Sequence, residues 1–416
     1  MFGEQSSLFS FLETAARQVF GNYEYEELRA PLLEFTSLFQ RSIGSETDVV
    51  RKEMFTFTDR KGRSLSLRPE ATAGALRAFI ESGRDKQPGI ARLFSIGPMF
   101  RYERPQKGRM RQFHQINCEC LGSGSPYIDA ELICMLMDFL TRAEIKNLSL
   151  QINSLGCREC RDNYIQVLKE YLKNKASDGL CTDCAARLTT NPLRTLDCKE
   201  AGCREILAGV PRLLDYNCPS CQNHFSKALE LLRGQGIEPH INHRLVRGLD
   251  YYCRTTFEVV SEDIGAQTAV AGGGRYDGLV RELGGEDTPG AGFACGMERL
   301  ALLLDGRKTE RRPDFYLACP DPENMEAAFS LTQELRKHNY SGEMNYAPAG
   351  FKKLMREAAR LKSRVCLILG ANEMASHSVM LKNMDTGEQE AVAMGRLPGA
   401  LAGILQGRLP NVNNKR

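Results

Sequence analysis

The stretch from Phe100 to Glu119 constrains the fold more than any other part of the sequence. Strand-like residues, Phe100-Arg101-Tyr102-Glu103, lead into a basic, turn-rich tip, Arg104-Pro105-Gln106-Lys107-Gly108-Arg109. The chain then returns as a second strand-like run, Arg111–Glu119. This order predicts an antiparallel hairpin with a long, positively charged loop.

Side chains alternate across a strand, so residues two apart share a face. One face of the returning run carries Arg111, Phe113, Gln115, Asn117 and Glu119, and the other carries His114, Ile116, Cys118 and Cys120. The second set suits a core, whereas the first mixes cations, an aromatic ring, an amide and a carboxylate. A solvated face is the alternative for that first set, but the mixture favours a binding site. Arg101, which shares a strand face with Glu103, could grip a phosphate together with Arg111, and Phe113 could stack on a base.

The rest of the chain alternates helical and strand-like segments. Helical spacing of apolar residues predicts helices over 8–19, 128–145, 325–337 and 352–361. Strand patterns occur at 64–68, 243–260, near Ala269, at 315–319 and at 365–369, and 292–304 predicts a strand that turns into a helix. A charged linker is expected at 307–312, followed by a small α/β domain whose terminal residues 411–416 are frayed.

Bulk composition bounds the class of protein. A length of 416 residues suggests two or three domains, and 42% hydrophobic with 26% charged residues is typical of a soluble globular chain. No run is apolar enough to cross a bilayer, and no secretory signal is seen, so we expect a cytoplasmic protein without a membrane partner. The net charge of +3 neither demands nor excludes a nucleic-acid partner.

The cysteines are concentrated in one region. Eight of the 15 fall in a mostly helical stretch, 157–232, that we interpret as an insertion. The odd total and the missing signal argue against a disulfide framework. Cys157 and Cys160 with Cys181 and Cys184 have the spacing of a four-thiolate zinc site, and a second set could come from Cys198, Cys203, Cys218 and Cys221. Reduced thiols in helix turns and cores are the alternative.

Five ordered motifs carry a family resemblance. Phe100–Phe113 with the following His-Gln resembles motif 2 of class II aminoacyl-tRNA synthetases in its histidyl form. Gly292–Leu300 resembles motif 3, and Leu32–Glu34 leading to Arg41–Gly44 resembles motif 1. Arg247–Tyr252 and Gly272–Leu279 are similar to signatures peculiar to histidyl-tRNA synthetases of bacterial type. The resemblance extends at lower specificity to about residue 405.

The resemblance implies an α+β fold with three parts. Residues 1–154 and 233–307 would form the class II catalytic domain, an antiparallel sheet flanked by helices. Residues 155–232 would form a Cys-rich helical insertion that contacts the tRNA acceptor arm, and 313–416 an α/β anticodon-binding domain. The implied enzyme is a ligase that activates L-histidine with ATP to histidyl-adenylate, releases pyrophosphate and transfers histidine to the 3′ end of tRNA(His). It would use ATP with Mg²⁺ and act as a homodimer. The resemblance does not itself require a zinc ion, so structural zinc in the insertion depends on whether the cysteines bind it.

The resemblance also assigns the ATP site. Arg101 would hold the α-phosphate, Arg299 the γ-phosphate end, and Phe113 would lie against adenine, with Arg109 and Arg111 as further phosphate contacts. Arg247 would bridge the substrate carboxylate and the α-phosphate as an electrostatic catalyst, so Arg247 and Arg101 are the expected catalytic residues. A structural ion pair is the alternative for Arg247.

Histidine and tRNA contacts are implied in the same way. Glu119 and Tyr252 would pair the imidazole, Glu70, Thr72 and Gln115 would accept from the α-ammonium, and Tyr251 would complete the pocket together with Arg247. Arg104 and Gln106 would touch the tRNA acceptor end. In the C-terminal domain a basic stripe could contact tRNA or be a solvated helix face; it comprises Lys352, Lys353, Arg356, Arg360, Lys362 and Arg364.

Two other interpretations compete with this one. The first is the catalytically silent, synthetase-like regulatory subunit of ATP phosphoribosyltransferase, which typically lacks the two histidyl signatures and the anticodon domain. The second is a zinc-dependent nucleic-acid-binding protein, suggested by the Cys pairs alone. The sequence departs from the family at Ala71, where Gly is usual, and before the first helix, where a short segment is expected to be absent or to lie upstream of Met1.

Overall fold

The computed structural model describes residues 1–45, 47–175, 179–264, 269–304, 306–307 and 312–405. The chain divides into two compact units, Met1–Lys308 and Thr309–Arg416. The predicted frayed end, 411–416, and most of the predicted linker, 307–312, lie outside the described residues. No helix in the described part is both long and apolar enough to span a membrane.

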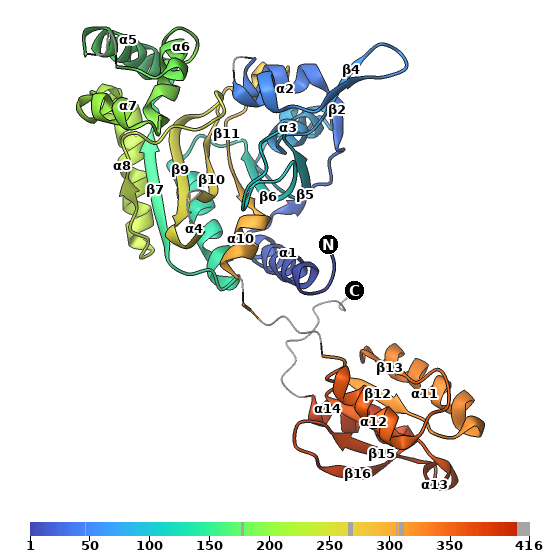
Figure 1. Cartoon of the computed structure of the whole chain (residues 1–416). Coiled ribbons are helices and arrows are strands. Elements are labelled where there is room, and N and C mark those ends of the chain that lie inside the picture. Colours follow the sequence, from blue (N-terminus) through green and yellow to red (C-terminus); the bar gives the residue numbers. More distant parts are fainter. Residues whose placement is uncertain (46, 176–178, 265–268, 305, 308–311, 406–416) are drawn as a thin grey trace. The chain divides into compact units, whose positions relative to one another are not determined.

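The first unit is built on an eight-stranded sheet, in the order β1-β5-β6-β11-β10-β9-β7-β8 (Figure 1). In that order the strands span Glu26–Glu27, Ala91–Phe100, Gln112–Leu121, Gly290–Gly296, Ala269–Arg275, Cys253–Ser261, Leu148–Ser154 and His240–Ile241. All pairings between β5 and β7 are antiparallel, which confirms the predicted sheet, but the edge strands β1 and β8 pair in parallel.

The predicted hairpin is confirmed as β5 and β6, paired from Ala91 with Leu121 to Phe100 with Gln112. β5 ends at Phe100, three residues before the end of the predicted strand-like run at Glu103. Arg101 therefore lies beyond the strand, although its N–H still donates to the carbonyl of Arg111 at 2.9 Å. The hairpin therefore delivers both arginines to the same end of the sheet.

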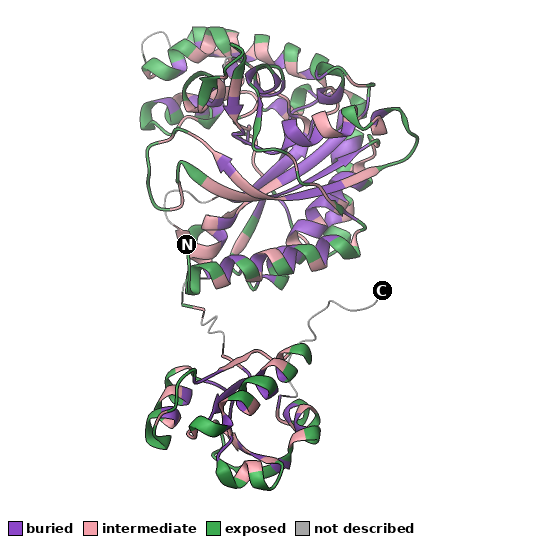
Figure 2. Ribbon diagram, turned by 90° about the vertical axis from the view of Figure 1, so that its right-hand side faces the viewer, coloured by how far each residue is buried: buried purple, intermediate pink, exposed green. Residues whose placement is uncertain are grey.

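Helices α1 (Glu4–Asn22), α4 (Pro126–Arg142) and α10 (Met297–Leu303) share one hydrophobic core with the sheet. Leu12, Ala16 and Phe20 of α1 are fully buried there. Ile116 and Cys118 of β6 lie in the same core, as predicted for that face. Figure 2 shows the buried strands between layers of helices that are exposed on their outer sides.

A second core involves α2 (Thr36–Ile43), α3 (Thr72–Glu81) and α9 (Leu279–Glu282). A small sheet, β2-β4-β3, accompanies them and comprises Leu33–Phe35, Ser64–Leu67 and Thr56–Thr58. Short helical turns, η1 (Val49–Glu53) and η2 (Arg84–Lys86), complete this part. Ala71, the departure from the family pattern, has a right-handed backbone (φ −98°), so its methyl group causes no strain.

The Cys-rich stretch is helical in its described part, as predicted. It contains α5 (Arg158–Lys175), α6 (Thr182–Thr190), η3 (Pro192–Asp197), α7 (Ala201–Ile206), η4 (Leu207–Gly209), η5 (Leu213–Tyr216) and α8 (Pro219–Gly234). Phe225, Leu229 and Leu232 of α8 pack into the first core. The stretch thus belongs to the first compact unit, and its predicted boundaries, 155 and 232, stay a prediction.

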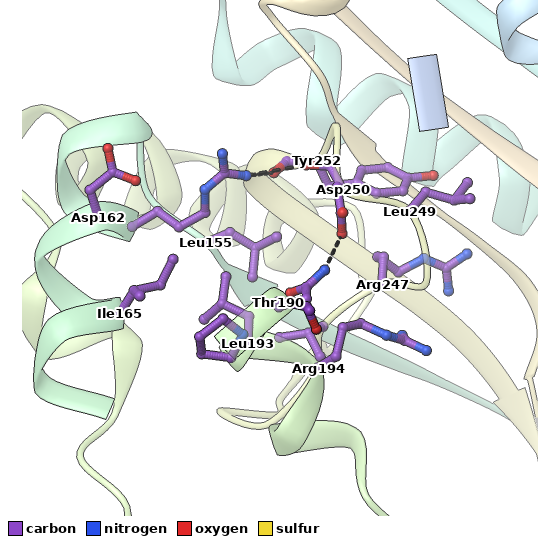
Figure 3. A pocket seen from close by; sticks show the side chains of 14 residues that line it. Leu155, Asp162, Ile165, Thr190, Leu193, Arg194, Arg247, Leu249, Asp250 and Tyr252 are labelled. Carbon is purple, nitrogen blue, oxygen red and sulfur yellow. Dashed lines mark hydrogen bonds between the residues drawn. The ribbon is translucent and has the colours of Figure 1, made fainter. Parts of the chain in front are cut away.

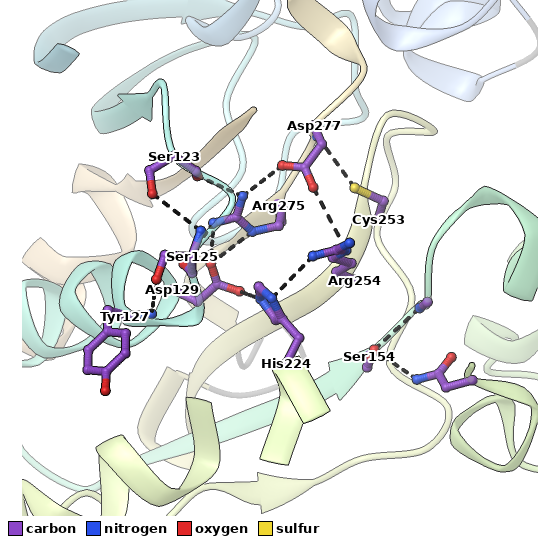
Figure 4. Close-up of polar contacts among 12 residues, drawn as sticks. Ser123, Ser125, Tyr127, Asp129, Ser154, His224, Cys253, Arg254, Arg275 and Asp277 are labelled. Atoms are coloured by element: carbon purple, nitrogen blue, oxygen red, sulfur yellow. Dashed lines mark hydrogen bonds and ion pairs between the residues drawn. The ribbon is translucent and has the colours of Figure 1, made fainter. Parts of the chain in front are cut away.

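A buried polar network joins α8 to α4 and β10 (Figure 4). Asp129 accepts from Arg275 Nη2 at 2.6 Å and lies 2.7 Å from His224 Nε2, while Arg275 also pairs with Asp277 at 2.7 Å. Burial opposes ionisation of Asp129, but the His224 hydrogen bond and the Arg275 charge outweigh it and lower the pKa of Asp129. Arg275 and Asp277, inside a histidyl signature, are therefore structural here.

The second unit is an α/β domain, as predicted. Its sheet has the order β13-β12-β14-β15-β16, with strands Gly342–Met344, Phe315–Ala318, Val365–Ile368, Ser378–Asn383 and Gln389–Ala393. Alternate residues of β12 face different cores: Phe315 and Leu317 contact α11 (Met325–Lys337) and α14 (Leu397–Ile404), and Tyr316 contacts α12 (Phe351–Arg360). Helices therefore cover both faces of this sheet. The remaining short elements of this unit are η7 (Pro322–Asn324), α13 (Ala371–Ala375) and η8 (Met394–Arg396), and the first unit also contains η6 (Glu262–Ile264).

Candidate active site

Glu119 is the centre of a buried polar cluster on β6. Its Oε1 accepts a hydrogen bond from Thr72 Oγ1 at 2.6 Å, and its Oε2 accepts from the Tyr276 hydroxyl. Burial raises the pKa of Glu119 to about 8, against the opposing effect of the two hydroxyl donors. The Tyr251 ring lies 5.6 Å from the Tyr276 ring and 4.6 Å from the Tyr252 ring. The structure therefore brings four of the predicted histidine-site residues together.

Glu70 and Gln115 supply further acceptors beside this cluster. The Glu70 carboxylate accepts from the backbone N–H groups of Thr72 at 2.7 Å and Ala73 at 2.9 Å, which holds it at the start of α3. Gln115 Oε1 is buried and has no hydrogen-bond partner within the described residues. Since Gln115 and Glu119 lie on the same face of β6, the cluster offers acceptor atoms to a cation.

Arg101 and Phe113 lie against one another at the loop end of the hairpin. The Arg101 guanidinium is 5.4 Å from the centre of the Phe113 ring, and its Nε donates to the Pro69 carbonyl at 2.9 Å. Arg111 instead lies over Tyr102, with 4.3 Å between its guanidinium carbon and the ring centre. A cation and a stacking ring are thus paired, as nucleotide binding requires.

Arg299 connects α10 to the loop of the hairpin. Its Nε donates to the Gly108 carbonyl at 3.4 Å and its Nη1 to the Ala269 carbonyl at 2.5 Å. Burial, together with the positive charge of Arg109, lowers the pKa of Arg299. Arg109 itself pairs with Glu103 at 3.0 Å. These contacts place two predicted phosphate ligands in one cationic region.

The tip of the loop is open to solvent. Arg104 and Gln106 are both exposed, and Gln106 forms a tight turn with Arg109. An exposed basic tip is available to a large anionic partner.

Arg247 forms an ion pair with Glu258 of β9, and its guanidinium carbon lies 5.8 Å from the Tyr252 ring centre. A Cβ at Gly272 of β10 would collide with that guanidinium. A Cβ at Gly292 of β11 would likewise collide with Glu119. The glycines of two signatures therefore make room for charged site residues.

Four participants were not predicted as site residues: Tyr276, Glu258, Gly272 and Gly292. Tyr276 lies within a recognised signature, 272–279, and that was the available signal. Glu258 gave no signal, because a single carboxylate in an apolar strand has no distinguishing spacing. Its pairing with Arg247 depends on the neighbouring positions of β9 and the 247–252 loop.

The structure corrects the grouping of the cysteines. The predicted set joined Cys157 and Cys160 to Cys181 and Cys184. The sulfur atoms instead converge in two other sets: Cys157, Cys160, Cys218 and Cys221, and separately Cys181, Cys184, Cys198 and Cys203. The start of α5 lies beside the start of α8, which brings the first and last pairs together. Spacing along the chain does not reveal this.

Arginines beside an aromatic ring, next to buried carboxylates on an antiparallel sheet, are the arrangement expected of a class II aminoacyl-tRNA synthetase site. A family model described as histidyl-tRNA synthetase matches residues 4–300, and one described as anticodon binding domain matches 314–403. A relative from Nitratidesulfovibrio vulgaris (strain DP4), named histidine–tRNA ligase, is 56% identical over 392 residues, 94% of each chain. One of the same name from Oleidesulfovibrio alaskensis is 54% identical over 405 residues, 97% of each. The chain belongs to the histidyl-tRNA synthetase family.

Solved structures agree with this assignment. The apo histidyl-tRNA synthetase of S. aureus is 31% identical and superposes with a TM-score of 0.80, covering 96% of this chain and 97% of that one. A Bacillus halodurans protein titled as an ATP phosphoribosyltransferase regulatory subunit/histidyl-tRNA synthetase is 18% identical, with a TM-score of 0.63 over 89% of this chain and 96% of that one. At that identity the likeness concerns the fold alone. The predicted family and ligase class are confirmed, and neither competing interpretation is supported.

Proposed function

We propose that this chain activates L-histidine with ATP and transfers it to the 3′ end of tRNA(His). The observation that carries the proposal is the buried acceptor set formed by Glu119, Glu70 and Gln115 beside the guanidinium of Arg247. A substrate with a cationic amine, a carboxylate and an imidazole N–H complements this arrangement. The phosphate-binding arginines at the adjacent hairpin complement ATP.

In the activation step, a carboxylate oxygen of histidine attacks the α-phosphorus of ATP, and pyrophosphate leaves with the electron pair of the broken P–O bond. Both reactants are anions, so the cations must offset repulsion and the charge that develops at phosphorus. We assign the α-phosphate to Arg101 and the γ-phosphate end to Arg299, with Phe113 against adenine. Arg247, on release from Glu258, bridges the carboxylate and the α-phosphate. ATP enters as its magnesium complex, so Mg²⁺ is part of the substrate.

Histidine selection follows from paired donors and acceptors. A neutral imidazole has one N–H donor and one acceptor nitrogen. We assign the donor to the carboxylate of Glu119, whose position is fixed by Thr72 and Tyr276. Tyr252 serves the other nitrogen, and Glu70 with Gln115 receives the α-ammonium. An amino acid without the imidazole would leave these buried groups unpaired, which is costly.

Two surfaces are proposed for tRNA. Arg104 and Gln106 at the exposed loop tip suit the acceptor end. On α12, the apolar residues Leu354 and Ala358 are buried, while Lys352, Lys353 and Arg356 are exposed. The exposed stripe suits a phosphate backbone. Since tRNA charging accompanies protein synthesis, we also propose a cytoplasmic location.

A homodimer is supported by apolar surface at motif 1. Leu33 and Phe35 of β2 are 45% and 48% exposed, and Phe57 of β3 is 44% exposed. Exposed apolar patches of this kind mark protein interfaces. Sedimentation equilibrium should give twice the chain mass, and a monomer at micromolar concentration would contradict the dimer.

Besides the substrate ATP with its Mg²⁺, we propose structural zinc in the insertion, since each cysteine set offers sulfur donors that suit this metal.

Aminoacylation tests the function directly. Purified chain, ATP, Mg²⁺ and labelled histidine are mixed with unfractionated tRNA, and acid-precipitable label is counted. We expect label in a single isoacceptor family that a histidine anticodon probe detects. Labelled tRNA that the probe does not detect, or no labelled tRNA at all, would contradict the proposal.

A further inference from the structure

Each cysteine set has the dimensions of a tetrahedral metal site. All four sulfur atoms of a set lie within 4.8 Å of one another, and two of the separations are 3.5 Å (Cys157–Cys160) and 3.8 Å (Cys181–Cys198). Four sulfurs at ~2.3 Å from a central zinc lie ~3.8 Å apart. A disulfide needs ~2.05 Å between sulfurs, and every cysteine is free. A bridging iron–sulfur cluster would hold its ligands farther apart than these sets allow.

The first set connects the starts of the first and last helices of the insertion. Cys157 and Cys160 lie at the start of α5, and Cys218 and Cys221 at the start of α8. The N–H of Cys157 donates to Cys221 Sγ at 3.2 Å, and the N–H of Cys218 donates to Cys160 Sγ at 3.0 Å. These reciprocal bonds stabilise thiolates, because N–H donors offset their negative charge.

The second set lies inside the insertion. Cys181 caps α6, with Cys184 in its first turn; Cys198 follows η3 and Cys203 lies in α7. The N–H of Cys181 donates to Cys203 Sγ at 3.2 Å. In both sets, short cysteine-bearing turns from separate places in the chain thus converge on a sulfur-only donor set. Such a set favours zinc over the hard cations that accompany nucleotides.

Both sets lie next to segments that hold the 247–252 loop. Arg161, which follows Cys160 in α5, donates from Nη1 to the carbonyls of Asp250 and Tyr252, each at 3.2 Å. Asn191, between α6 and η3, donates to the Asp250 carboxylate at 2.6 Å. A pocket of about 210 Å³ lies between the insertion and the loop. Its lining includes Asp250 and Tyr252 of the loop and Leu193 and Arg194 of the insertion (Figure 3).

We infer that each chain holds two structural zinc ions, one in each cysteine set. By fixing the fold of the insertion, the two ions stabilise its contacts with the 247–252 loop. The importance of that loop for histidine rests on the proposed function. The zinc ions themselves do not, because their presence is measured without any activity. Binding replaces the thiol protons by the metal, so four thiolates surround each Zn²⁺.

Metal content tests the first half of the inference. The full chain is purified without chelator, and metals are quantified by plasma mass spectrometry and by native mass spectrometry. We expect two zinc ions per folded chain, both released when eight thiols are titrated with a mercurial reagent. One zinc ion per chain or fewer, or iron in place of zinc, would overturn the inference. Histidine-dependent pyrophosphate exchange is measured separately, so a failure of the zinc inference is distinguishable from a failure of the proposed function.

Two quadruple variants test the grouping. The first combines Cys157→Ser, Cys160→Ser, Cys218→Ser and Cys221→Ser, and it should retain one zinc ion. The second combines Cys157→Ser, Cys160→Ser, Cys181→Ser and Cys184→Ser, and it should retain none. The grouping suggested by sequence spacing gives the reverse counts and would contradict the structure.

Cys134→Ser, outside both sets, is the control and should retain two zinc ions. If the quadruple variants fail to fold, the release of two zinc ions from the unaltered chain still decides the metal content.

Hydrogen exchange tests whether the zinc ions stabilise the 247–252 loop. After removal of zinc from the full chain by a chelator, amide exchange in 247–252 should become at least several-fold faster, while exchange in β12 of the second unit stays unchanged. Unchanged exchange in the loop after complete zinc loss would show that the zinc ions do not stabilise it.

Discussion

Kinetic measurements can distinguish a catalytic role of Arg247 from a role in substrate binding. Its guanidinium is held by Glu258 and Tyr252 and is accommodated by Gly272. A permanently charged cation is thus placed beside the pocket. Arg247→Ala should lower kcat by about 10²–10³-fold, because donors aimed at developing charge have effects of that order. KM for histidine should change much less.

Steady-state pyrophosphate exchange measures both constants for Arg247→Ala. Arg244→Ala, three residues upstream and exposed, is the control and should behave like the unaltered chain. Equal losses in kcat and in histidine affinity would argue that Arg247 only binds substrate.

Titration of Glu119 should make kcat/KM for histidine depend on pH. Burial raises its pKa to about 8, so the carboxylate is mostly protonated at neutral pH before histidine binds. The ionised form accepts the imidazole N–H, so kcat/KM for histidine should rise as pH increases through about 8. Glu119→Gln should lose this limb of the profile. Because free histidine titrates identically in both assays, superimposable profiles would contradict the assignment.

The same residues show what sequence reasoning can reach at this scale. Alternation on one strand correctly placed Gln115 and Glu119 on one face, and the family resemblance located Thr72 and Tyr252. Glu258 was missed because its partner, Arg247, comes from a loop, and loop conformation is not encoded in a local period. Arg111 was expected beside Arg101 at the phosphate, but its contact in the structure is the Tyr102 ring.

At the scale of elements, the Asp129 network anchors α8 on α4 and β10. Asp129→Asn would remove one of the two carboxylates that pair with the buried guanidinium of Arg275. We expect a loss of about 3–5 kcal/mol in the free energy of unfolding, as is usual when one partner of a buried pair is removed. Asp287→Asn, which breaks the exposed pair with Arg281, should cost less than about 1 kcal/mol.

Denaturant unfolding followed by circular dichroism measures both changes. Equal stabilities of the two variants would show that the network contributes nothing beyond a surface ion pair.

Elements were predicted best where apolar spacing was strong. The helices over 8–19 and 128–145 and the hairpin of β5 and β6 follow directly from local periodicity. The parallel edge strands β1 and β8 have two residues each, too few to show a period. The cysteine grouping was wrong because it depends on how α5 and α8 meet, which is tertiary information.

At the scale of the whole molecule, the first compact unit contains the candidate active site, and the second contains the basic stripe on α12 that we propose for tRNA. Charge reversal on α12, Lys352→Glu with Lys353→Glu and Arg356→Glu, should raise KM for tRNA on the order of tenfold or more, because phosphate contacts dominate such affinity. Pyrophosphate exchange should stay unchanged, since α12 belongs to the second unit.

Lys337→Glu, exposed on α11 of the same unit, is the matched control. An unchanged KM for tRNA in the α12 variant would mean that the stripe is a solvated helix face. The fold of this unit was predictable from strand and helix order, but its RNA contacts were not, because charge on a surface helix is common without a ligand.

The central claim is that this site activates histidine, and pyrophosphate exchange into ATP measures that step alone. With folded chain, Mg²⁺ and ATP, label from pyrophosphate should enter ATP when L-histidine is added and remain at background with other amino acids. No histidine-dependent exchange in folded protein, or equal exchange with an amino acid lacking the imidazole, would contradict this claim.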